Sequence, residues 1–458
     1  MDDRFARKRV HVIGLGAYGT GREVARALWQ RGAQVTVSDV KPAAALAAEI
    51  EALKETGAAV QTGDEAYRGI EEADLVVPSP GVPLDIPPLL RARERGIRVV
   101  SEIEVAFWIA PCPIIAVTGT KGKTTTAALI GELLHDAGRS VLVGGNIGRP
   151  LITLAEAAGP EDILAAEVSS FQLEATERFR PRVAVLLNLF PDHLDRHSTM
   201  EAYRNAKAKL LANQTPEDAA VINRDDDEAW RMRALARAQV IPYSTAQPAG
   251  DGADIADGAL RIKGAPVCPI DTVRLLGRHN LSNVLAALAA TDAIGASLDR
   301  AADTLSRFEG IEHRLEVVAT VAGVTFVNDS QATTPEAAIA ALNAFDRRTA
   351  LIAGGRPKVH DFRRLAEAAA RRQTSLIVIG EAAEEIAAAG EAAGVRQISR
   401  AADLKEAVYL AFDGARPGGV VLLSPACASF DMFENMAARG DAFKQIVREL
   451  ALQKGDDE

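Results

Sequence analysis

The chain has 458 residues, which is enough for two or three domains with separate hydrophobic cores. Apolar residues make up 48% of it and charged residues 25%, which excludes a disordered, collagen-like or disulfide-stapled protein. The net charge is −10 and no block of like charges occurs, so we expect no nucleic-acid partner.

The cysteines lie singly, at Cys112, Cys268 and Cys427, without the paired spacing of a zinc site or a disulfide framework. No run approaches the roughly 18 apolar residues of a membrane span. Glycines interrupt the first apolar stretch before it could serve as a signal sequence. We therefore expect a cytoplasmic protein that does not insert into membranes.

Short β-branched runs alternate with alanine-rich helical stretches along the whole chain, which predicts an α/β fold with parallel sheets. In the first part, a helix is predicted over residues 20–30, and strands are predicted over 8–14, 33–39 and 73–79. We place the end of the first domain near residue 102, so that it spans 1–102.

The middle of the chain continues this alternation as a second domain over 103–310. Its strands are predicted at residues 113–119, 140–145, 163–170, 183–189 and 219–223. A Gly-, Ala- and Asp-rich patch at 247–264 predicts a loop or a small hairpin, and a helix is predicted over 279–294. A third domain over 311–458 has strands predicted at 323–330, 349–355, 375–380 and 418–425.

The first motif, GLGAYG at residues 14–19, follows a predicted strand and opens the helix at 20–30. Its glycines, Gly14 and Gly16 among them, would permit a tight turn that brings a helix N-terminus close to a diphosphate. Asp39 ends the next strand, 20 residues beyond the motif, as in a dinucleotide-binding pattern. NAD and other nucleotide diphosphates both fit, and glycines that only shape the turn are the alternative.

The second motif, GTKGKTTT at residues 119–126, lies between an apolar strand and a long helix. Backbone N–H groups of this loop would cradle phosphates, Lys123 would reach the β- and γ-phosphates, and the Thr124 hydroxyl would ligate Mg²⁺. Val117 stands where the strict phosphate-loop pattern GxxxxGK[ST] has its first glycine. A purely structural turn is therefore the alternative.

Acidic and histidine side chains follow the next two predicted strands. Glu167 and Ser169 end one strand, and His193 follows the other. Because carboxyl ends of parallel strands share one edge, Glu167 and His193 would lie beside the phosphate loop and suit a divalent metal. A solvated strand end for Glu167 and a structural role for His193 are the alternatives. From chemistry alone, Lys207 and Lys209 on a later helix are expected to lie on its solvated face.

These motifs together resemble the Mur ligases of peptidoglycan synthesis. The resemblance extends over all three predicted domains and also accounts for Val117, because the family uses a GTxGK[ST] loop. The motifs that carry it are GLGAYG, SPGVP, GTKGKTTT, GGNIGRP, EVSSFQLE, FPDHLDRH, GRHNLSN, HRLE, NDSQATTPEA and LLSPACASFDMF. It implies a Rossmann-like N-terminal domain, a central P-loop ATPase-type domain with a mostly parallel sheet, and a Rossmann-like C-terminal domain.

The resemblance also implies a reaction, in which ATP and D-glutamate convert UDP-N-acetylmuramoyl-L-alanine to its D-glutamyl amide through an acyl phosphate. The implied partners are these substrates, with ATP and two Mg²⁺ ions, and we expect the chain to act as a monomer. Lys123 and Thr124 would hold the ATP phosphates and the first Mg²⁺, whose ligands would include Glu167. His193 would help to hold the second Mg²⁺.

Family members carry a carbamylated lysine at the end of a YxxxK pattern, here Tyr203 to Lys207. The resemblance therefore implies that Lys207 is a carbamylated metal ligand, and Lys209 is kept as the alternative. Carbamylation needs a neutral amine, although a free lysine has a pKa of about 10.4. The ATP contacts that the resemblance implies are Gly119, Thr120, Lys121, Gly122, Lys123, Thr124, Thr125, Asn280, Asn283, Arg314 and Asp329.

The C-terminal domain is implied to close over ATP and to bind the D-glutamate carboxylates through Thr333, Lys358 and Ser429. The residues implied on the UDP-sugar side are Gly14, Gly16, Asp39, Ser79, Gly81, Asn146, Ser169 and Gln172. One departure concerns the acceptor: Gln331 stands where the family usually has a lysine. That replacement leaves the local geometry of D-glutamate binding open.

Four other interpretations compete with this one. The L-alanine-adding branch has an acidic run where EVSSFQLE stands here, and folylpolyglutamate synthetase lacks the first domain. An NAD-dependent dehydrogenase explains GLGAYG and Asp39 but leaves the phosphate loop, Glu167 and His193 unexplained. A catalytically silent nucleotide-sugar sensor would not need the metal ligands.

Overall fold

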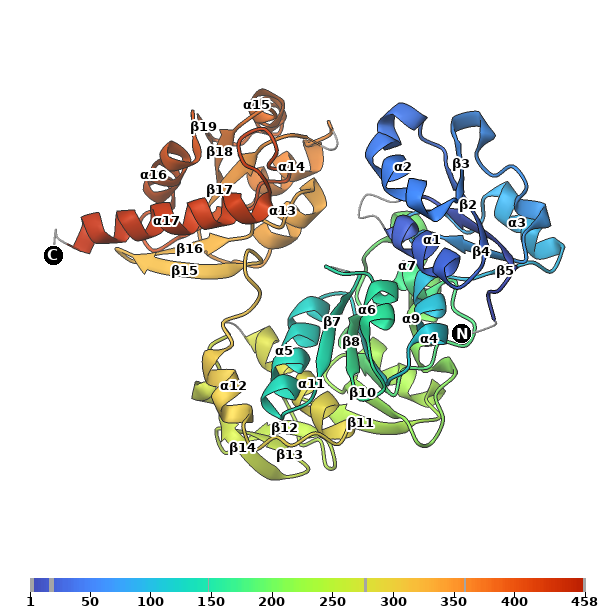
Figure 1. Ribbon diagram of the computed structural model, residues 1–458. Helices are drawn as coiled ribbons and strands as arrows, with labels where there is room; N and C mark the ends of the chain where they lie inside the picture. The colour runs from blue at the N-terminus through green and yellow to red at the C-terminus, as the bar shows by residue number, and fades with distance from the viewer. Residues whose placement is uncertain (1–3, 16–19, 147, 276–277, 358–359, 456–458) are drawn as a thin grey trace. The chain divides into compact units, whose positions relative to one another are not determined.

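The computed structural model describes residues 4–15, 20–146, 148–275, 278–357 and 360–455 (Figure 1). The chain divides into two compact units, Met1–Phe308 and Glu309–Glu458. Three mostly parallel sheets, two in the first unit and one in the second, are flanked by helices, which confirms the α/β prediction. No helix in the described ranges is both long enough and apolar enough to cross a membrane.

The first sheet is wholly parallel, with strand order β3-β2-β1-β4-β5. Its strands are β1 (Arg9–Ile13), β2 (Gln34–Asp39), β3 (Ala59–Thr62), β4 (Leu75–Pro78) and β5 (Arg98–Val99). Helices α1 (Thr20–Gln30) and α2 (Ala47–Leu53) pack on one face through Leu28 and Leu53. Helix α3 (Pro87–Glu94) packs on the other face through Leu89. Val10 and Val12 of β1 pack on the first of these faces and Ile13 on the other, because the strand is covered on both sides.

The second sheet has nine strands in the order β14-β13-β12-β11-β10-β9-β6-β8-β7. It is parallel from β7 to β12 and antiparallel beyond. The strands are β6 (Ile114–Thr118), β7 (Val141–Gly145), β8 (Ile163–Glu167), β9 (Val183–Leu186), β10 (Ala219–Asn223), β11 (Gln239–Tyr243), β12 (Ala253–Ala256), β13 (Ala259–Ile262) and β14 (Ala265–Pro269). The predicted hairpin is confirmed as β12–β13, which turns at Asp257 and Gly258, both with positive φ.

Helices cover both faces of this second sheet. One face packs against α5 (Lys123–Asp136), α11 (Arg278–Ala293) and α12 (Ala301–Arg307). The other face packs against α4 (Glu102–Ile109), α6 (Leu151–Ala157), α7 (Ser170–Leu173) and α9 (Met200–Ala212). The short elements of the first unit are α8 (Leu194–His197), α10 (Asp227–Arg231), η1 (Ala43–Leu46), η2 (Lys54–Thr56), η3 (Gly63–Glu65), η4 (Ile70–Glu72), η5 (Met232–Leu235) and η6 (Ile270–Thr272).

One hydrophobic core continues from the first sheet into the second, because Leu28 of α1 and Leu151 of α6 belong to the same buried cluster. Helices α1 and α6 are in direct contact. In the second sheet, β6 lies between β8 and β9, so the chain leaves β6 in opposite directions. In open α/β sheets, ligands bind at such a switch point, beyond the carboxyl ends of the strands.

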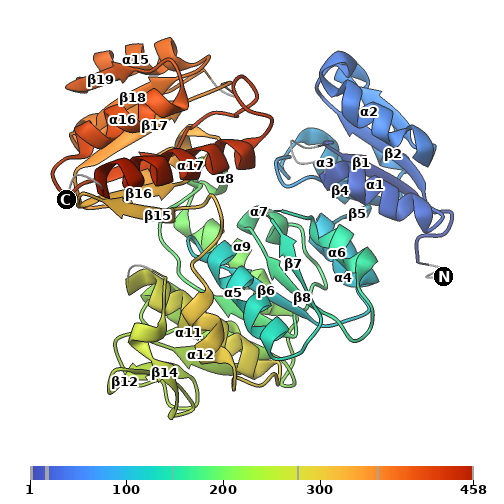
Figure 2. The ribbon, with the colours of Figure 1, turned by 60° about the vertical axis from the view of Figure 1, so that its left-hand side comes forward.

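The sheet of the second unit has the order β15-β16-β20-β17-β18-β19, with only the β15–β16 pair antiparallel. Its strands are β15 (Glu316–Val321), β16 (Val324–Asn328), β17 (Thr349–Gly354), β18 (Ser375–Ile379), β19 (Gln397–Arg400) and β20 (Val420–Leu423). Helices α13 (Pro335–Leu342), α14 (Arg363–Arg371) and α15 (Ala383–Ala392) cover one face. Helices α16 (Leu404–Ala415) and α17 (Met436–Gly455) cover the other, as Figure 2 shows for α17.

Candidate active site

The loop between β6 and α5 has the geometry of a phosphate-binding loop. Gly122 takes a left-handed conformation, with φ of 88°, immediately before the first turn of α5. The Lys123 ammonium donates to the carbonyl oxygens of Gly119 and Thr120, both at 3.0 Å, and so lies over the loop. A cation and a helix N-terminus at one point favour a bound phosphate.

Asn188, which sequence patterns did not indicate, holds this loop in place. Its Oδ1 accepts from the Lys121 backbone N–H at 2.9 Å, and its Nδ2 donates to the Lys121 carbonyl at 3.1 Å. Its own carbonyl accepts from the Thr120 N–H at 3.0 Å. Asn188 lies just beyond β9, the strand beside β6, and an amide at that position is the signal that could have identified it.

Glu167, at the carboxyl end of β8, is buried rather than solvated, with 2% of its surface exposed. Its Oε2 accepts from the Thr124 hydroxyl at 2.6 Å, and its Oε1 accepts from the Asn146 amide at 3.0 Å. A hydroxyl and a carboxylate oxygen so close together at a phosphate loop suit Mg²⁺, which prefers oxygen ligands. Asn146, predicted on the UDP-sugar side, thus contacts the carboxylate predicted to bind metal.

Lys207 lies on the buried face of α9 and is 1% exposed, so the solvated-face interpretation is wrong for it. Its ammonium donates to the Gly119 carbonyl at 3.0 Å and to the Thr118 hydroxyl at 3.3 Å. Burial, followed by the charge of Lys123, lowers the pKa of Lys207 well below its ordinary value, although Asp192 and Glu167 oppose the shift. The lowered pKa therefore favours the neutral amine of Lys207 beside the phosphate loop.

Lys207 and Lys209 have different contacts, Lys207 with Tyr203 and Lys209 with Glu174. Tyr203 is buried against the Lys207 ammonium, 4.8 Å from ring centroid to Nζ, and burial raises the pKa of its phenol to about 12. Its hydroxyl contacts the Thr120 hydroxyl at 3.2 Å. Lys209 is half-buried and donates to the Glu174 carbonyl at 2.6 Å, so it does not reach the phosphate loop through that contact.

His193 immediately precedes α8, has a left-handed backbone and has a half-exposed side chain. Its ring lies 5.0 Å from the Phe171 ring, and its Nε2 is 4.0 Å from Asp192. Among the described residues, no hydrogen bond joins His193 to Glu167 or Lys207. The structure therefore brings together Thr124, Glu167 and Lys207 around the loop, while the metal role of His193 stays a prediction.

Asn280 and Asn283, the predicted adenosine contacts, lie on α11, which packs along α5. The Asn283 amide donates to the Asn280 Oδ1 at 2.9 Å. A Cβ added to Gly122 would lie 2.3 Å from Asn283 Oδ1. The structure thus places Asn283 against the phosphate loop, where a nucleotide that extends from the loop would meet it.

In the second unit, Asp329 follows β16 and is 5% exposed. It accepts from the Ser424 hydroxyl at 2.7 Å and from the Leu315 N–H at 3.2 Å. Burial raises the pKa of Asp329 to about 6, and the hydrogen bonds and the charge of Arg314 oppose this shift. Asp329 and Arg314, both predicted to contact ATP, therefore lie near each other.

The predicted acceptor residues also belong to the second unit. The Ser429 hydroxyl is buried and has no hydrogen-bond partner among the described residues, as expected of a group that meets a ligand. Thr333 lies in the turn after β16, where its N–H donates to the Gln331 carbonyl at 2.9 Å. The Gln331 amide donates to the Glu312 carbonyl at 3.3 Å. Lys358 lies outside the described residues.

Four of the predicted UDP-sugar residues, Gly14, Asp39, Ser79 and Gly81, lie at or just beyond the carboxyl ends of β1, β2 and β4. Gly14 has φ of 83°, and its carbonyl accepts from the Ser79 hydroxyl at 2.5 Å. The Asp39 carboxylate accepts from the Leu15 and Lys41 N–H groups, both at 3.0 Å. Gly81 has no atom within 4 Å of an added Cβ. Gly16 lies outside the described residues.

Ser169 and Gln172 form the capping box of α7. Gln172 is 3% exposed, accepts from the Ser169 N–H at 3.0 Å and faces the Glu102 carboxyl at 3.5 Å. Glu102 also accepts from the Ile152 N–H at 2.6 Å, and burial raises its pKa to about 7. The contacts between Ser169 and Gln172 cap α7, and a ligand role for these two residues stays a prediction.

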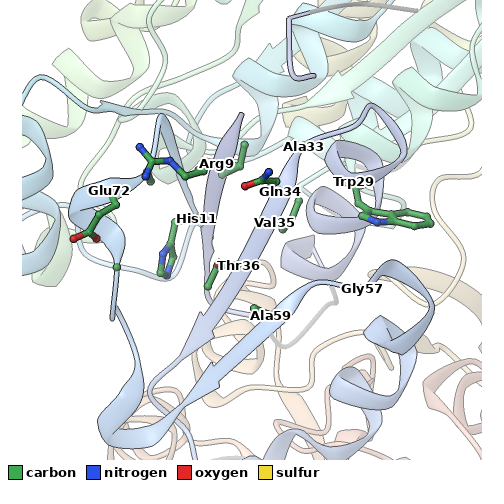
Figure 3. Close-up of a pocket in the computed structure, with 13 residues that line it drawn as sticks. Arg9, His11, Trp29, Ala33, Gln34, Val35, Thr36, Gly57, Ala59 and Glu72 are labelled. Carbon is green, nitrogen blue, oxygen red and sulfur yellow. The ribbon is translucent and has the colours of Figure 1, made fainter. Parts of the chain in front are cut away.

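A cavity of about 470 Å³ opens beside the amino-terminal halves of β1 and β2 (Figure 3). Figure 3 shows Arg9, His11 and Glu72 on one side of it and Trp29 on the far side. His11 already shares a hydrogen bond with the Ser38 hydroxyl at 2.9 Å, and burial lowers its pKa to about 4. None of the predicted site residues within the described ranges lines this cavity, so it is separate from the candidate site.

Three family models match successive parts of the chain. The N-terminal domain of MurD-like Mur ligases matches residues 8–101, the Mur ligase middle domain 117–291, and the Mur ligase glutamate ligase domain 313–427. A relative from Pelotomaculum thermopropionicum is 47% identical over 98% of this chain and 99% of its own length. One from Acidobacterium capsulatum is 44% identical over 96% of each chain. Both are named UDP-N-acetylmuramoylalanine--D-glutamate ligase.

Solved structures share the fold. The UDP-N-acetylmuramate-alanine ligase MurC of Thermotoga maritima has a TM-score of 0.54 at 18% identity and covers 97% of this chain and 100% of its own. The MurF ligase of the same organism, in complex with ADP, has a TM-score of 0.53 at 18% identity, with 98% and 100% covered. The resemblance noted from the motifs is confirmed, and the chain belongs to the Mur ligase family.

Proposed function

We propose that the chain is an ATP-dependent amide ligase that joins D-glutamate to UDP-N-acetylmuramoyl-L-alanine in cytoplasmic peptidoglycan precursor synthesis. The observation that carries this proposal is the similarity, over 96–98% of the chain, to relatives named for that reaction. The phosphate loop with its buried Glu167 supports the use of ATP. Both ATP and a UDP-linked sugar are metabolites of the cytoplasm.

The proposed chemistry has two steps, because a free carboxylate does not react with an amine in water. A carboxylate oxygen of the L-alanyl group attacks the γ-phosphorus of ATP, and ADP leaves. The amine of D-glutamate then attacks the acyl carbon, a proton is lost from nitrogen, and phosphate leaves. Both steps depend mainly on positioning and on neutralising negative charge.

The residues around the phosphate loop supply these requirements. Lys123 lies over the loop and would neutralise the β- and γ-phosphate oxygens. The Thr124 hydroxyl and the Glu167 carboxylate, 2.6 Å apart, would hold a Mg²⁺ ion. That ion would supply positive charge for the transferring phosphoryl group. Asn188 would keep the loop rigid through its contacts with Lys121.

Lys207 is proposed to carry a carbamate. Its lowered pKa favours the neutral amine, which adds to CO₂ and releases a proton to form an anionic N-carboxylate. The product would place negative charge next to Gly119, where a second Mg²⁺ ion with His193 as a further ligand would be held. Lys209, with its ammonium on the Glu174 carbonyl, is not needed for this role.

The second unit is proposed to bind D-glutamate and part of the nucleotide. The buried Ser429 hydroxyl, which lacks a partner among the described residues, would donate to an acceptor carboxylate, with Thr333 and Lys358 as further contacts. Asp329 and Arg314 would contact ATP. In the first unit, Gly14, Asp39 and Ser79 would hold the UDP-sugar.

The test is acceptor-dependent phosphate release from ATP with UDP-N-acetylmuramoyl-L-alanine and Mg²⁺. D-Glutamate, L-glutamate, D-aspartate and L-alanine are compared as acceptors, and the Lys123→Ala variant is the control for phosphate release by the loop. We expect release with D-glutamate to exceed release with the other three. Equal release with L-alanine, or release unaffected by Lys123→Ala, would contradict the proposal.

A further inference from the structure

A second cleft, of about 720 Å³, lies in the first unit where the C-terminal half of α1 faces α6. Three arginines line it. Arg26 belongs to α1, Arg31 directly follows α1, and Arg149 lies in the turn before α6. Glu156 of α6 is the carboxylate among the lining residues. Arg26 also pairs with Glu23, at 3.1 Å, so three arginines face two carboxylates and the cleft keeps an excess of one positive charge.

Glu156 is fully engaged by two of these arginines. Its Oε2 accepts from Arg26 at 2.8 Å and its Oε1 accepts from Arg31 at 2.9 Å, while its side chain is only 12% exposed. Arg149 is exposed, and although its backbone carbonyl accepts from the Gly145 N–H at 2.8 Å, its guanidinium forms no hydrogen bond or ion pair with any residue in the described ranges. Its guanidinium is thus left without a counter-charge on the cleft wall.

The same wall holds a polar atom without a partner. The Thr153 hydroxyl, in the first turn of α6, has almost no solvent exposure and no hydrogen-bond partner among the described residues. A buried hydroxyl without a partner costs free energy and is uncommon in folded proteins. A ligand that accepted from Thr153 and from Arg149 would satisfy both groups.

This cleft is separate from the sites already described. Its α1 residues, Arg26 and Gln30, belong to the C-terminal half of that helix, whereas the predicted diphosphate position is at the other end, roughly 9 to 15 Å away at about 1.5 Å per residue. None of the phosphate-loop residues lines it. A ligand bound here would therefore leave both substrate positions free.

We propose that this cleft is an anion-binding site for a small phosphate-bearing molecule. Guanidinium groups match the paired oxygens of phosphate, and the Thr153 hydroxyl would donate a further hydrogen bond. Ile109 adds an apolar wall, and the cleft is larger than a phosphate ion needs. The favoured ligand is accordingly a phosphate monoester with a compact apolar body. Free phosphate, which offers the same oxygens without that body, is the alternative ligand.

The experiment is calorimetric titration of the full chain with inorganic phosphate and, separately, with phenyl phosphate. ADP and Mg²⁺ are present throughout so that the phosphate loop is filled. The variants are Arg149→Ala, Thr153→Val and, as the matched control, Arg237→Ala. Arg237 is an exposed arginine of the same unit that does not line the cleft.

We expect the wild type and Arg237→Ala to bind phenyl phosphate equally, and Arg149→Ala to bind it about tenfold more weakly or worse. Thr153→Val should weaken binding by about threefold or more without lowering the melting temperature, because the hydroxyl that it removes has no partner to lose. Stronger binding of phosphate than of phenyl phosphate would assign the site to the free ion. Equal binding by all four proteins would overturn the proposal.

Discussion

Gly122→Ala tests the link between the phosphate loop and the nucleotide contacts. Gly122 has φ of 88°, and a left-handed conformation costs a residue with a Cβ about 1–2 kcal/mol. The new Cβ would lie 2.3 Å from Asn283 Oδ1, so the Asn283 side chain must move and lose its 2.9 Å hydrogen bond to Asn280. Loss of that bond costs about a further 0.5–1.5 kcal/mol of stability. If Asn283 also leaves the nucleotide site, a similar loss of binding energy raises the KM for ATP about 2- to 10-fold.

The matched control is Gly138→Ala, at the other end of the same helix. Gly138 also has positive φ, 74°, but an added Cβ there would have no atom within 4 Å. Gly138→Ala should lose about 1–2 kcal/mol of unfolding free energy in urea and Gly122→Ala about 1.5–3.5 kcal/mol, and only Gly122→Ala should raise the KM for ATP. An unchanged KM for ATP in Gly122→Ala, or an equal rise in both variants, would refute the placement of Asn283 beside the nucleotide.

Further predictions concern the buried lysine, a buried carboxyl and the acceptor site. Lys207→Ala should lose most turnover and regain part of it with acetate as a substitute anion, whereas Lys209→Ala should remain active; steady-state rates with and without acetate decide between them. Glu102 has its pKa raised from 4.5 to about 7, so the folded protein holds a proton that the unfolded chain loses, and stability falls as pH rises through this window by about 3 kcal/mol. Glu102→Gln should remove this fall, which unfolding in urea at pH 5 and pH 8 would reveal, and a persistent fall would exclude Glu102 as its source. Gln331→Lys should change the KM for D-glutamate or the turnover if the charge matters, and unaltered kinetics would mean that other contacts already compensate.

Much of the fold could be predicted because its elements have strong local patterns. The helix predicted at residues 20–30 matches α1, and the Asp257–Gly258 turn forms the predicted hairpin. No strand was predicted at β11, β14, β15 or β19. None was predicted either at β3, whose four residues are at most partly buried, or at β5, which has only two residues. Such short strands depend on pairing with a neighbour rather than on their own residues.

The candidate site was predictable where a motif fixes local geometry and less so where distant segments meet. GTKGKTTT indicated the phosphate loop, because the loop conformation follows from its glycines. The burial of Lys207 was not predictable from its chemistry, although it shares a helical face with the apolar Tyr203 and Leu210. Asn188 and the contact of Asn146 with Glu167 depend on the pairing of strands, which sequence spacing does not specify.

The formation of an acyl phosphate is the central claim, and isotope transfer tests it most directly. UDP-N-acetylmuramoyl-L-alanine labelled with ¹⁸O in its carboxylate is incubated with the protein, ATP, Mg²⁺ and D-glutamate. If a carboxylate oxygen attacks the γ-phosphorus, the released phosphate carries one labelled oxygen, which mass spectrometry detects, and the amide product retains the other. Unlabelled phosphate alongside amide formation would contradict the account.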